Sequence, residues 1–316
     1  MIDLKNIKNP KTKEYISKIS SVKYAGTNPN ELAALLDKCA KTDLEKAFVI
    51  YVWLALNLQY DAAGFFSNQT NDCEPVTVLK QRKGVCSGYA RLFRALANIM
   101  KLKCENPWAY AKGVGFQPGQ IPKVKGEANH EYNKVFLNNS WFIIDNNWGS
   151  GILNGMEFQP RFNLHYFLCY PDQFIYEDFP KNPADQLLKN PITWERFFDM
   201  VLLWPEYFFI YGFNAIEPNK APVKATDSLE ITLHLMSSNP RSVLYKVELI
   251  EKGKSQGRNQ INEKPLQQGC TIKIKISFAS EGKFKVQIFA LNPDQAGGYQ
   301  DIICEMNVDV TFSKKN

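Results

Sequence analysis

Apolar side chains recur every three to four residues in two stretches of the first third of the chain. One stretch covers residues 43–58 and follows Thr42, and Glu45 completes a capping-box pattern with that threonine. The other stretch begins at Cys86. This spacing predicts two helices that each bury one face. The apolar positions are Leu44, Ala47, Phe48, Tyr51, Leu54, Ala55 and Leu58 in the first stretch, and Tyr89, Leu92, Phe93, Leu96 and Met100 in the second.

The period of the apolar pattern changes to two after residue 107. Three segments alternate apolar and polar side chains, as half-buried strands do. They are Trp108–Val114, Glu131–Leu137 and Trp141–Asp145. Helices therefore precede strands along the chain, which is typical of the α+β class.

The last third of the chain reads almost wholly as strands. Residues 213–227 are rich in Pro, Asn, Lys and Ala, and this composition predicts a linker. The pattern beyond it predicts an all-β, Ig-like sandwich over residues 228–316, preceded by an α+β domain over residues 1–212 whose residues 1–28 form an N-terminal arm. The strand candidates are Leu229–Leu235, Val243–Ile250, Thr271–Phe278, Lys283–Ala290 and Ile302–Phe312.

Composition narrows the class of protein. The chain has 316 residues, 45% of them hydrophobic and 22% charged, which is ordinary for a globular protein. The formal net charge of +6 is spread along the chain, so we expect a solvated surface and no nucleic-acid partner. The first residues lack the apolar segment of a secretory signal, and no run of about 18 apolar residues occurs. We therefore expect a cytoplasmic protein without a membrane span.

Cysteine spacing argues against a zinc site. There are seven cysteines, at wide spacings and with no C-x-x-C pair. We expect free thiols, most of them buried, and no metal or organic cofactor. A functional cysteine must then be distinguished by its surroundings.

Cys86 has such surroundings. It lies at the start of a predicted helix, between Val85 and Ser87-Gly88, so small residues leave room for a substrate. The positive end of the helix dipole and the unpaired backbone N–H groups favour the thiolate, which is the nucleophilic form. The same N–H groups could stabilise an oxyanion. The alternative is a small buried side chain that begins a helix.

A predicted hairpin brings a histidine toward an aspartate. Asn138-Asn139 suits a two-residue turn with positive φ, which would pair Leu137 with Ser140 and Tyr132 with Asp145. Because side chains alternate along a strand, His130 and Asp145 would then share a face as diagonal neighbours.

The pairing of His130 with Asp145 has a chemical meaning. An imidazole that accepts a thiol proton, oriented by a carboxylate, is the arrangement that activates a nucleophile. The alternative reading is a surface histidine at a strand start and an aspartate that ends a strand. The other two histidines, His165 and His234, lack comparable surroundings, and we interpret them as packing and strand residues.

Taken together, these segments resemble the transglutaminase-like superfamily, and specifically its kyphoscoliosis-peptidase branch. The resemblance implies a papain-like fold with Cys86 as nucleophile, His130 as general base and acid, and Asp145 as orienting carboxylate. One departure is Glu131, where the family commonly has a small residue. The segments that carry the resemblance are Tyr60-Asp61, Gly84–Ala90, His130, Trp141–Asp145, Trp148–Gly151, Tyr166–Leu168, Pro171, Phe174-Ile175, Gln186–Leu188 and Pro191–Thr193.

Three functions stay open at this point. The first is a cysteine peptidase or amidase that cleaves peptide or side-chain amides through an acyl-thioester. The second is a protein-crosslinking acyl transferase, in which a lysine amine replaces water, and the third is a catalytically silent binding module. The resemblance implies a protein or peptide partner with cytoskeletal or cell-wall-associated roles. The sequence pattern carries no information on oligomeric state.

Overall fold

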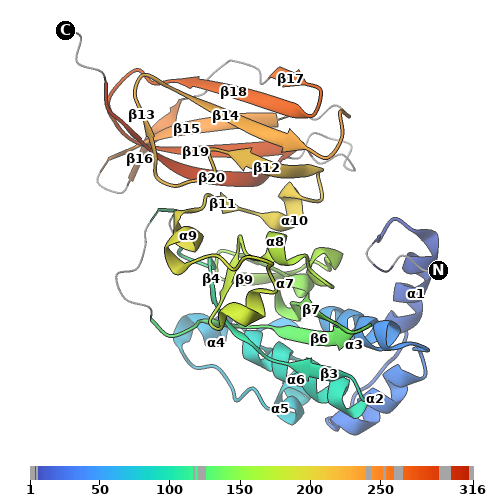
Figure 1. The fold of residues 1–316 in the computed structure, drawn as a ribbon. Coiled ribbons are helices and arrows are strands. Elements are labelled where there is room, and N and C mark those ends of the chain that lie inside the picture. The colour runs from blue at the N-terminus through green and yellow to red at the C-terminus, as the bar shows by residue number, and fades with distance from the viewer. Residues whose placement is uncertain are drawn as a thin grey trace. The chain divides into compact units, whose positions relative to one another are not determined.

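The computed structural model describes residues 4, 6–116, 118–119, 126–239, 243–251, 254–259, 266–291 and 300–312. The chain divides into two compact units (Figure 1). The first unit comprises Met1–Ala111, Glu127–Asp172 and Pro180–Pro191, and the second comprises Lys112–Gly126, Gln173–Phe179 and Ile192–Asn316. Among the described residues, no helix is long and apolar enough to cross a membrane.

Helix α3 (Asp43–Asn57) lies at the centre of the first unit. Its capping box forms in a shifted version: Thr42 Oγ1 accepts a hydrogen bond from Glu45 N at 3.2 Å, while Glu45 Oε2 accepts one from Lys41 N at 2.7 Å. Every side chain from Ala47 to Leu54 is fully buried. The helix is therefore covered all round, although the sequence pattern predicted only one buried face.

Helices α1, α2, α6 and α7 and strand β6 of the first unit pack against α3. Helix α6 begins at Cys86, as the sequence predicts. The N-terminal arm contains a helix, α1, that buries Tyr15 and Ile19 in the core of this unit. The remaining elements are α1 (Pro10–Ser20), α2 (Pro29–Asp37), β1 (Gln59–Tyr60), α4 (Ala62–Ser67), α5 (Pro75–Gln81), β2 (Lys83–Gly84), α6 (Cys86–Ile99), β3 (Lys103–Glu105), β4 (Trp108–Ala111), β5 (His130–Glu131), β6 (Asn133–Leu137), β7 (Ser140–Ile144), α7 (Asn146–Ser150), β8 (Gly151–Asn154), β9 (Glu157–Pro160) and two 3₁₀ turns, Leu164–Tyr166 and Pro183–Gln186; α8 (Pro171–Phe174) and β10 (Asp178–Pro180) each extend across a boundary between the units.

The predicted hairpin forms β6 and β7. Asn138 and Asn139 have φ values of 48° and 63°, and Leu137 pairs with Ser140, so the turn and the register are those expected. The paired ladder ends at Asn133 and Ile144, however, and the expected Tyr132–Asp145 pair does not form. The Tyr132 N–H donates instead to the carbonyl of Pro107 at 3.2 Å.

This interruption divides the strand that the sequence predicted over Glu131–Leu137. Its first part, β5, begins one residue earlier and pairs with β4, with Ala109 opposite His130. Its second part, β6, lies between β3 and β7 in a separate sheet. His130 and Asp145 therefore approach each other from different sheets and not across one hairpin.

The second unit contains two sheets that face each other across an aliphatic core (Figure 1). One sheet has the order β11-β20-β19-β15-β16, with β13 also on β20, and the other has the order β12-β14-β18-β17. The strict alternation of buried side chains in β14 and β18 agrees with the predicted Ig-like sandwich. The elements are α9 (Trp194–Asp199), β11 (Leu202–Leu203), α10 (Pro205–Phe208), β12 (Phe213–Glu217), β13 (Val223–Ala225), β14 (Ser228–Leu235), β15 (Val243–Glu251), β16 (Lys254–Asn259), β17 (Leu266–Gln268), β18 (Thr271–Ser277), β19 (Gly282–Leu291) and β20 (Gln300–Val310).

The region expected to be a linker is structured. Residues 213–227 contain β12, which pairs with β14, and β13, which pairs with β20. Residues 192–212, which the sequence interpretation placed in the catalytic domain, also belong to the second unit, where β11 pairs with β20. The α+β fold class with a C-terminal Ig-like domain is confirmed, while this boundary lies about 20 residues earlier than the sequence indicated.

Candidate functional site

The backbone leading to Cys86 is held by a short parallel strand pair. Tyr60 in β1 lies opposite Gly84 in β2. Asp61 follows directly: its Oδ1 accepts hydrogen bonds from Gly64 N at 3.2 Å and from Lys83 Nζ at 3.1 Å. This buried carboxylate therefore caps α4 and also anchors the strand that precedes the cysteine.

Cys86 is partly exposed at the first position of α6. The preceding residue, Val85, makes no side-chain capping hydrogen bond within the described part of the chain. The first N–H groups of α6 thus have no side-chain acceptor from the usual capping position, as a site for a substrate oxyanion requires. Burial raises the pKa of the Tyr60 phenol, and the nearby Cys86 raises it further.

His130 and Asp145 are in direct contact. His130 Nε2 lies 2.5 Å from Asp145 Oδ2, and both side chains are almost completely buried. The other carboxylate oxygen, Oδ1, accepts a hydrogen bond from Trp148 N at 3.0 Å and so caps α7. The Asp145 N–H donates to the carbonyl of Tyr166 at 3.0 Å. Both carboxylate oxygens and the backbone of Asp145 are thereby fixed.

Aromatic packing holds the imidazole from the side. The ring of Trp148 meets His130 edge to face, with 5.7 Å between ring centroids, and lies 6.0 Å from the ring of Tyr166. Edge-to-face contacts of this kind restrict ring rotation. Trp148 was part of the sequence resemblance but was assigned no specific role, although it lies only three residues after Asp145.

Asn129 connects the cysteine to the histidine segment. Its side chain bridges to Ala111, accepting from the backbone N–H at 2.7 Å and donating to the carbonyl at 3.3 Å. Its own carbonyl oxygen lies 4.0 Å from Cys86 Sγ. Cys86 is therefore placed against the residue that precedes His130. No sequence signal distinguished Asn129 in advance.

The site is supported by a buried polar cluster that sequence reasoning also missed. Asn133 Nδ2 donates to the Ala90 carbonyl in α6 and to Asn106 Oδ1, each at 2.9 Å. Asn106 Nδ2 donates in turn to Glu131 Oε1 at 3.0 Å. These bonds join α6 to the strands around His130. Because buried polar groups need partners, the cluster defines the spacing between those elements.

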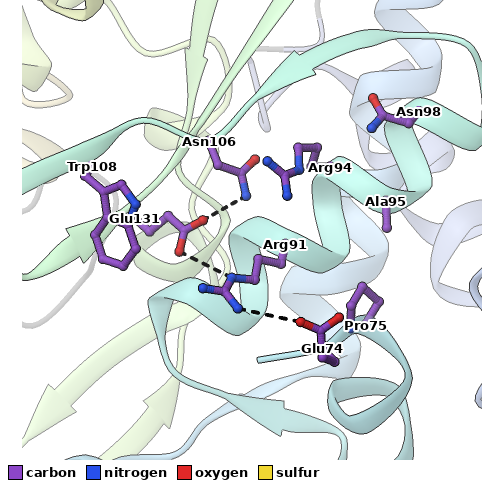
Figure 2. Close-up of a pocket in the computed structure, with 9 residues that line it drawn as sticks. All are labelled: Glu74, Pro75, Arg91, Arg94, Ala95, Asn98, Asn106, Trp108 and Glu131. Carbon is purple, nitrogen blue, oxygen red and sulfur yellow. Dashed lines mark hydrogen bonds and ion pairs between the residues drawn. The ribbon is translucent and has the colours of Figure 1, made fainter. Parts of the chain in front are cut away.

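A pocket of about 460 Å³ borders this cluster. Figure 2 shows that α6 supplies one wall through Arg91 and Arg94, while Trp108 and Glu131 line the opposite side. Trp108 of β4 pairs with Glu131 of β5, the residue next to His130. The pocket thus shares helix α6 with Cys86 and strand β5 with His130, although neither of these two residues lines it.

The other cysteines offer a contrast with Cys86. All seven are free thiols, as expected. Cys169 Sγ lies 3.8 Å from His165 Nε2, but both residues are buried, so a substrate has no access to the pair. Burial raises the pKa of Cys104 to about 12 and raises that of Cys304 well above its usual value.

The chain is similar in sequence to several known proteins. Over 83% of its length the chain is 28% identical to kyphoscoliosis peptidase of Homo sapiens, of which it spans 38%. It is 30% identical to hillarin of Drosophila melanogaster over 61% of the chain and 24% of that protein. Among solved structures, one described as a TGase aligns with 49% of the chain and 41% of its own, at 15% identity and a TM-score of 0.29.

Two family models match the chain itself. The transglutaminase-like superfamily model matches residues 30–146, which include Cys86, His130 and Asp145. The model of the KY-like, immunoglobulin-like domain matches residues 185–316. The chain therefore combines a domain of the transglutaminase-like superfamily with a KY-like, immunoglobulin-like domain.

Proposed function

We propose that this chain is a cysteine-nucleophile peptidase or amidase that acts on peptide or side-chain amides. Cys86 is the nucleophile, His130 the general base and acid, and Asp145 the carboxylate that orients the imidazole. The observation that carries the proposal is the 2.5 Å contact between His130 Nε2 and Asp145 Oδ2, beside a partly exposed cysteine at a helix N-terminus.

The contact assigns a role to each ring nitrogen. Because Nε2 faces Asp145, proton exchange with the Cys86 thiol falls to Nδ1. The buried carboxylate stabilises the imidazolium that forms when the thiol loses its proton. The edge of Trp148 limits rotation of the ring out of this orientation.

The reaction then runs in two halves. The Cys86 thiolate attacks the amide carbon, and the carbonyl oxygen becomes an oxyanion near the first N–H groups of α6. The C–N bond breaks, the amine leaves with the proton from His130, and a thioester remains. Water attacks the thioester, gives a proton to His130, and the C–S bond breaks to release the carboxylic acid and the thiol.

Replacing water with a lysine amine gives the acyl-transferase alternative. The first half of the reaction is identical, and the product is an isopeptide bond in place of an acid. The names of two relatives support the two versions separately: kyphoscoliosis peptidase, and Lim and transglutaminase domain protein ltd-1 of Caenorhabditis elegans. The fate of the thioester therefore has to be measured.

The test compares the parent chain with Cys86→Ala on a peptide library and on a glutamine donor, with and without an added amine. We expect release of peptide or ammonia by the parent and none above background by the variant. Incorporation of the amine would favour transfer over hydrolysis. Turnover that survives in Cys86→Ala would refute the nucleophile assignment.

A second readout needs no substrate. Brief iodoacetamide labelling of the folded chain near pH 7, followed by mass spectrometry, should modify Cys86 before Cys104 and Cys304, because burial raises the pKa of the latter two thiols. His130→Ala should reduce that advantage. Equal labelling of Cys86 and Cys104 would favour the silent binding module.

A further inference from the structure

The pocket beside the candidate site contains two arginines with different surroundings. Arg91 lies between two carboxylates: its Nε is 3.7 Å from Glu131 Oε2, and its Nη1 is 3.8 Å from Glu74 Oε1 (Figure 2). Glu131 is buried, with 4% of its surface exposed, and needs this compensation. The charge of Arg91 is therefore used within the protein.

Arg94 lies one helical turn further along the same face of α6. It is exposed and lines the pocket, and in Figure 2 its guanidinium is directed toward Asn106. Within the part of the chain that the structure describes, no hydrogen bond or ion pair engages this guanidinium. Arg91 is thus paired with two carboxylates, whereas the charge of Arg94 has no carboxylate partner among the described residues.

The groups around Arg94 suit a planar anion on a peptide. Asn98 is exposed on the same helix face and can add an amide donor. Trp108, 41% exposed, provides a flat apolar surface on the opposite side. Glu131 Oε1 accepts a hydrogen bond from Asn106, while Oε2 forms a 3.7 Å ion pair with Arg91 and receives no hydrogen bond from the described residues. A cationic ligand would therefore compete with Arg91, whereas a carboxylate meets unused donors.

We propose that this pocket is a substrate subsite that binds a peptide carboxylate through the Arg94 guanidinium, with the adjoining peptide packed on Trp108. The inference rests on the proposed function, because it names the class of substrate for that site. Arg–carboxylate pairs can form two parallel hydrogen bonds, which gives both affinity and orientation. The preferred substrate is thus a peptide with a carboxylate at a fixed distance from the cleaved amide.

The helix gives the approximate distance. Arg94 follows Cys86 by eight residues in α6, which corresponds to about 12 Å along the helix axis at about 1.5 Å per residue. An extended peptide covers about 3.3 Å per residue. The carboxylate should therefore lie roughly three to four residues from the cleaved bond. It belongs either to an acidic side chain or to the C-terminus of the substrate.

The test measures binding on Cys86→Ala, so that it does not depend on turnover. Fluorescently labelled peptides are compared by anisotropy in four versions. They carry Glu or Gln at the fourth residue from the amide to be cleaved, and they end in a C-terminal acid or amide. We expect carboxylate peptides to bind about tenfold or more tightly than the doubly neutral peptide, and less so at high salt. The version that gains affinity distinguishes an acidic side chain from a chain terminus.

Three further variants connect the effect to this residue. Arg94→Gln should remove the carboxylate preference, and Arg94→Lys should keep only part of it, because lysine cannot form the two parallel bonds. Lys13→Gln removes an equal charge from the exposed face of α1 and should leave the preference unchanged. Each variant is first compared with the parent by thermal denaturation, since Arg94 is exposed and should not affect folding.

Each outcome has one meaning for the subsite. Equal affinity for acidic and neutral peptides, absence of binding at millimolar peptide, or an equal loss in Lys13→Gln would overturn it. Carboxylate-dependent binding without cleavage by the parent would keep the subsite and refute the proposed function. Cleavage by the parent without any carboxylate preference would support the proposed function and refute the subsite.

Discussion

The surroundings of Cys86 and the core of the sandwich bury very different kinds of side chain. Around Cys86 the first unit encloses a histidine, an aspartate, a glutamate and an asparagine, each tied to named partners from other elements. The sandwich core of the second unit is built mainly from Ile, Val, Leu and Phe in strict alternation. The interior around Cys86 positions polar groups, whereas the interior of the sandwich excludes water.

This difference separates the sources of chemistry and of stability. A buried polar network contributes little net free energy but fixes geometry, since each group lost leaves a partner unsatisfied. An aliphatic core contributes in proportion to the area it removes from water. Changes in the first region should therefore act on rate, and changes in the second on the free energy of unfolding.

The largest effect is expected from Asp145→Asn. Asparagine keeps an oxygen that can cap α7 but loses the charge that faces His130. In Ser–His–Asp enzymes the corresponding change costs roughly 10⁴-fold in kcat, and we expect a loss of about 10²–10⁴-fold here with little loss of stability. Steady-state kinetics and thermal denaturation measure the two quantities. A variant that unfolded while its residual rate per folded molecule stayed normal would contradict the assigned role.

The complementary change is Ile274→Ala in β18. Ile274 is fully buried in the sandwich, and truncation of such a residue costs about 2–5 kcal/mol. Chemical denaturation should show this loss, while kcat of the folded protein stays unchanged. Lys275→Ala on the exposed face of the same strand is the control, expected within about 0.5 kcal/mol of the parent. A fall in kcat comparable to that of Asp145→Asn would erase the distinction between the regions.

A smaller effect tests the exception within the second unit. Lys112 is buried with its Nζ 4.5 Å from the centroid of the Phe197 ring, and no hydrogen bond reaches it from the described residues. Its pKa is lowered to about 7, chiefly by burial and then by nearby Arg196, while Glu177 and Cys304 act in the opposite direction. The unfolded chain, with an ordinary lysine pKa, binds this proton more readily between about pH 7 and pH 10. The charge therefore destabilises the fold most below pH 7, and the penalty fades as the pH rises.

Lys112→Met should remove that penalty. We expect the variant to be more stable than the parent by about 1–2 kcal/mol at pH 6, with the difference falling toward zero by pH 10. Denaturant titrations at pH 6, 8 and 10 provide the comparison. A variant less stable than the parent at pH 6 would show that the ammonium is compensated within the fold.

The fold was predictable where periodic patterns are long. Helices α3 and α6 and the sandwich strands have such patterns, and their bounds agree with the sequence within a few residues. Helix α1 was not predicted because it buries only three side chains. Strand β12 was not predicted because a register shift near Ala215 interrupts its alternation. In both cases tertiary packing supplies what the local pattern lacks.

The candidate site was predictable only in part. The turn at Asn138-Asn139 followed from hairpin geometry. The nearness of His130 to Asp145 was also predicted, but the two residues do not meet across that hairpin. The break at Tyr132 did not, because it depends on a hydrogen bond to Pro107, far away in the sequence. The pocket likewise combines Arg91, Trp108 and Glu131 from three separate elements, and no motif joins them.

The two oxygens of Asp145 have a consequence for the evolution of such domains. One oxygen caps α7 and the other holds His130, so the fold and the proposed chemistry depend on the same carboxylate. A relative without catalysis would still benefit from a capping side chain at this position, which aspartate or asparagine can provide. Retention of the aspartate in a relative is therefore weak evidence of an enzyme. Retention of the cysteine is more informative. The capping position of α6 is occupied by Val85, which makes no side-chain capping bond among the described residues, so the start of the helix does not require a thiol at Cys86.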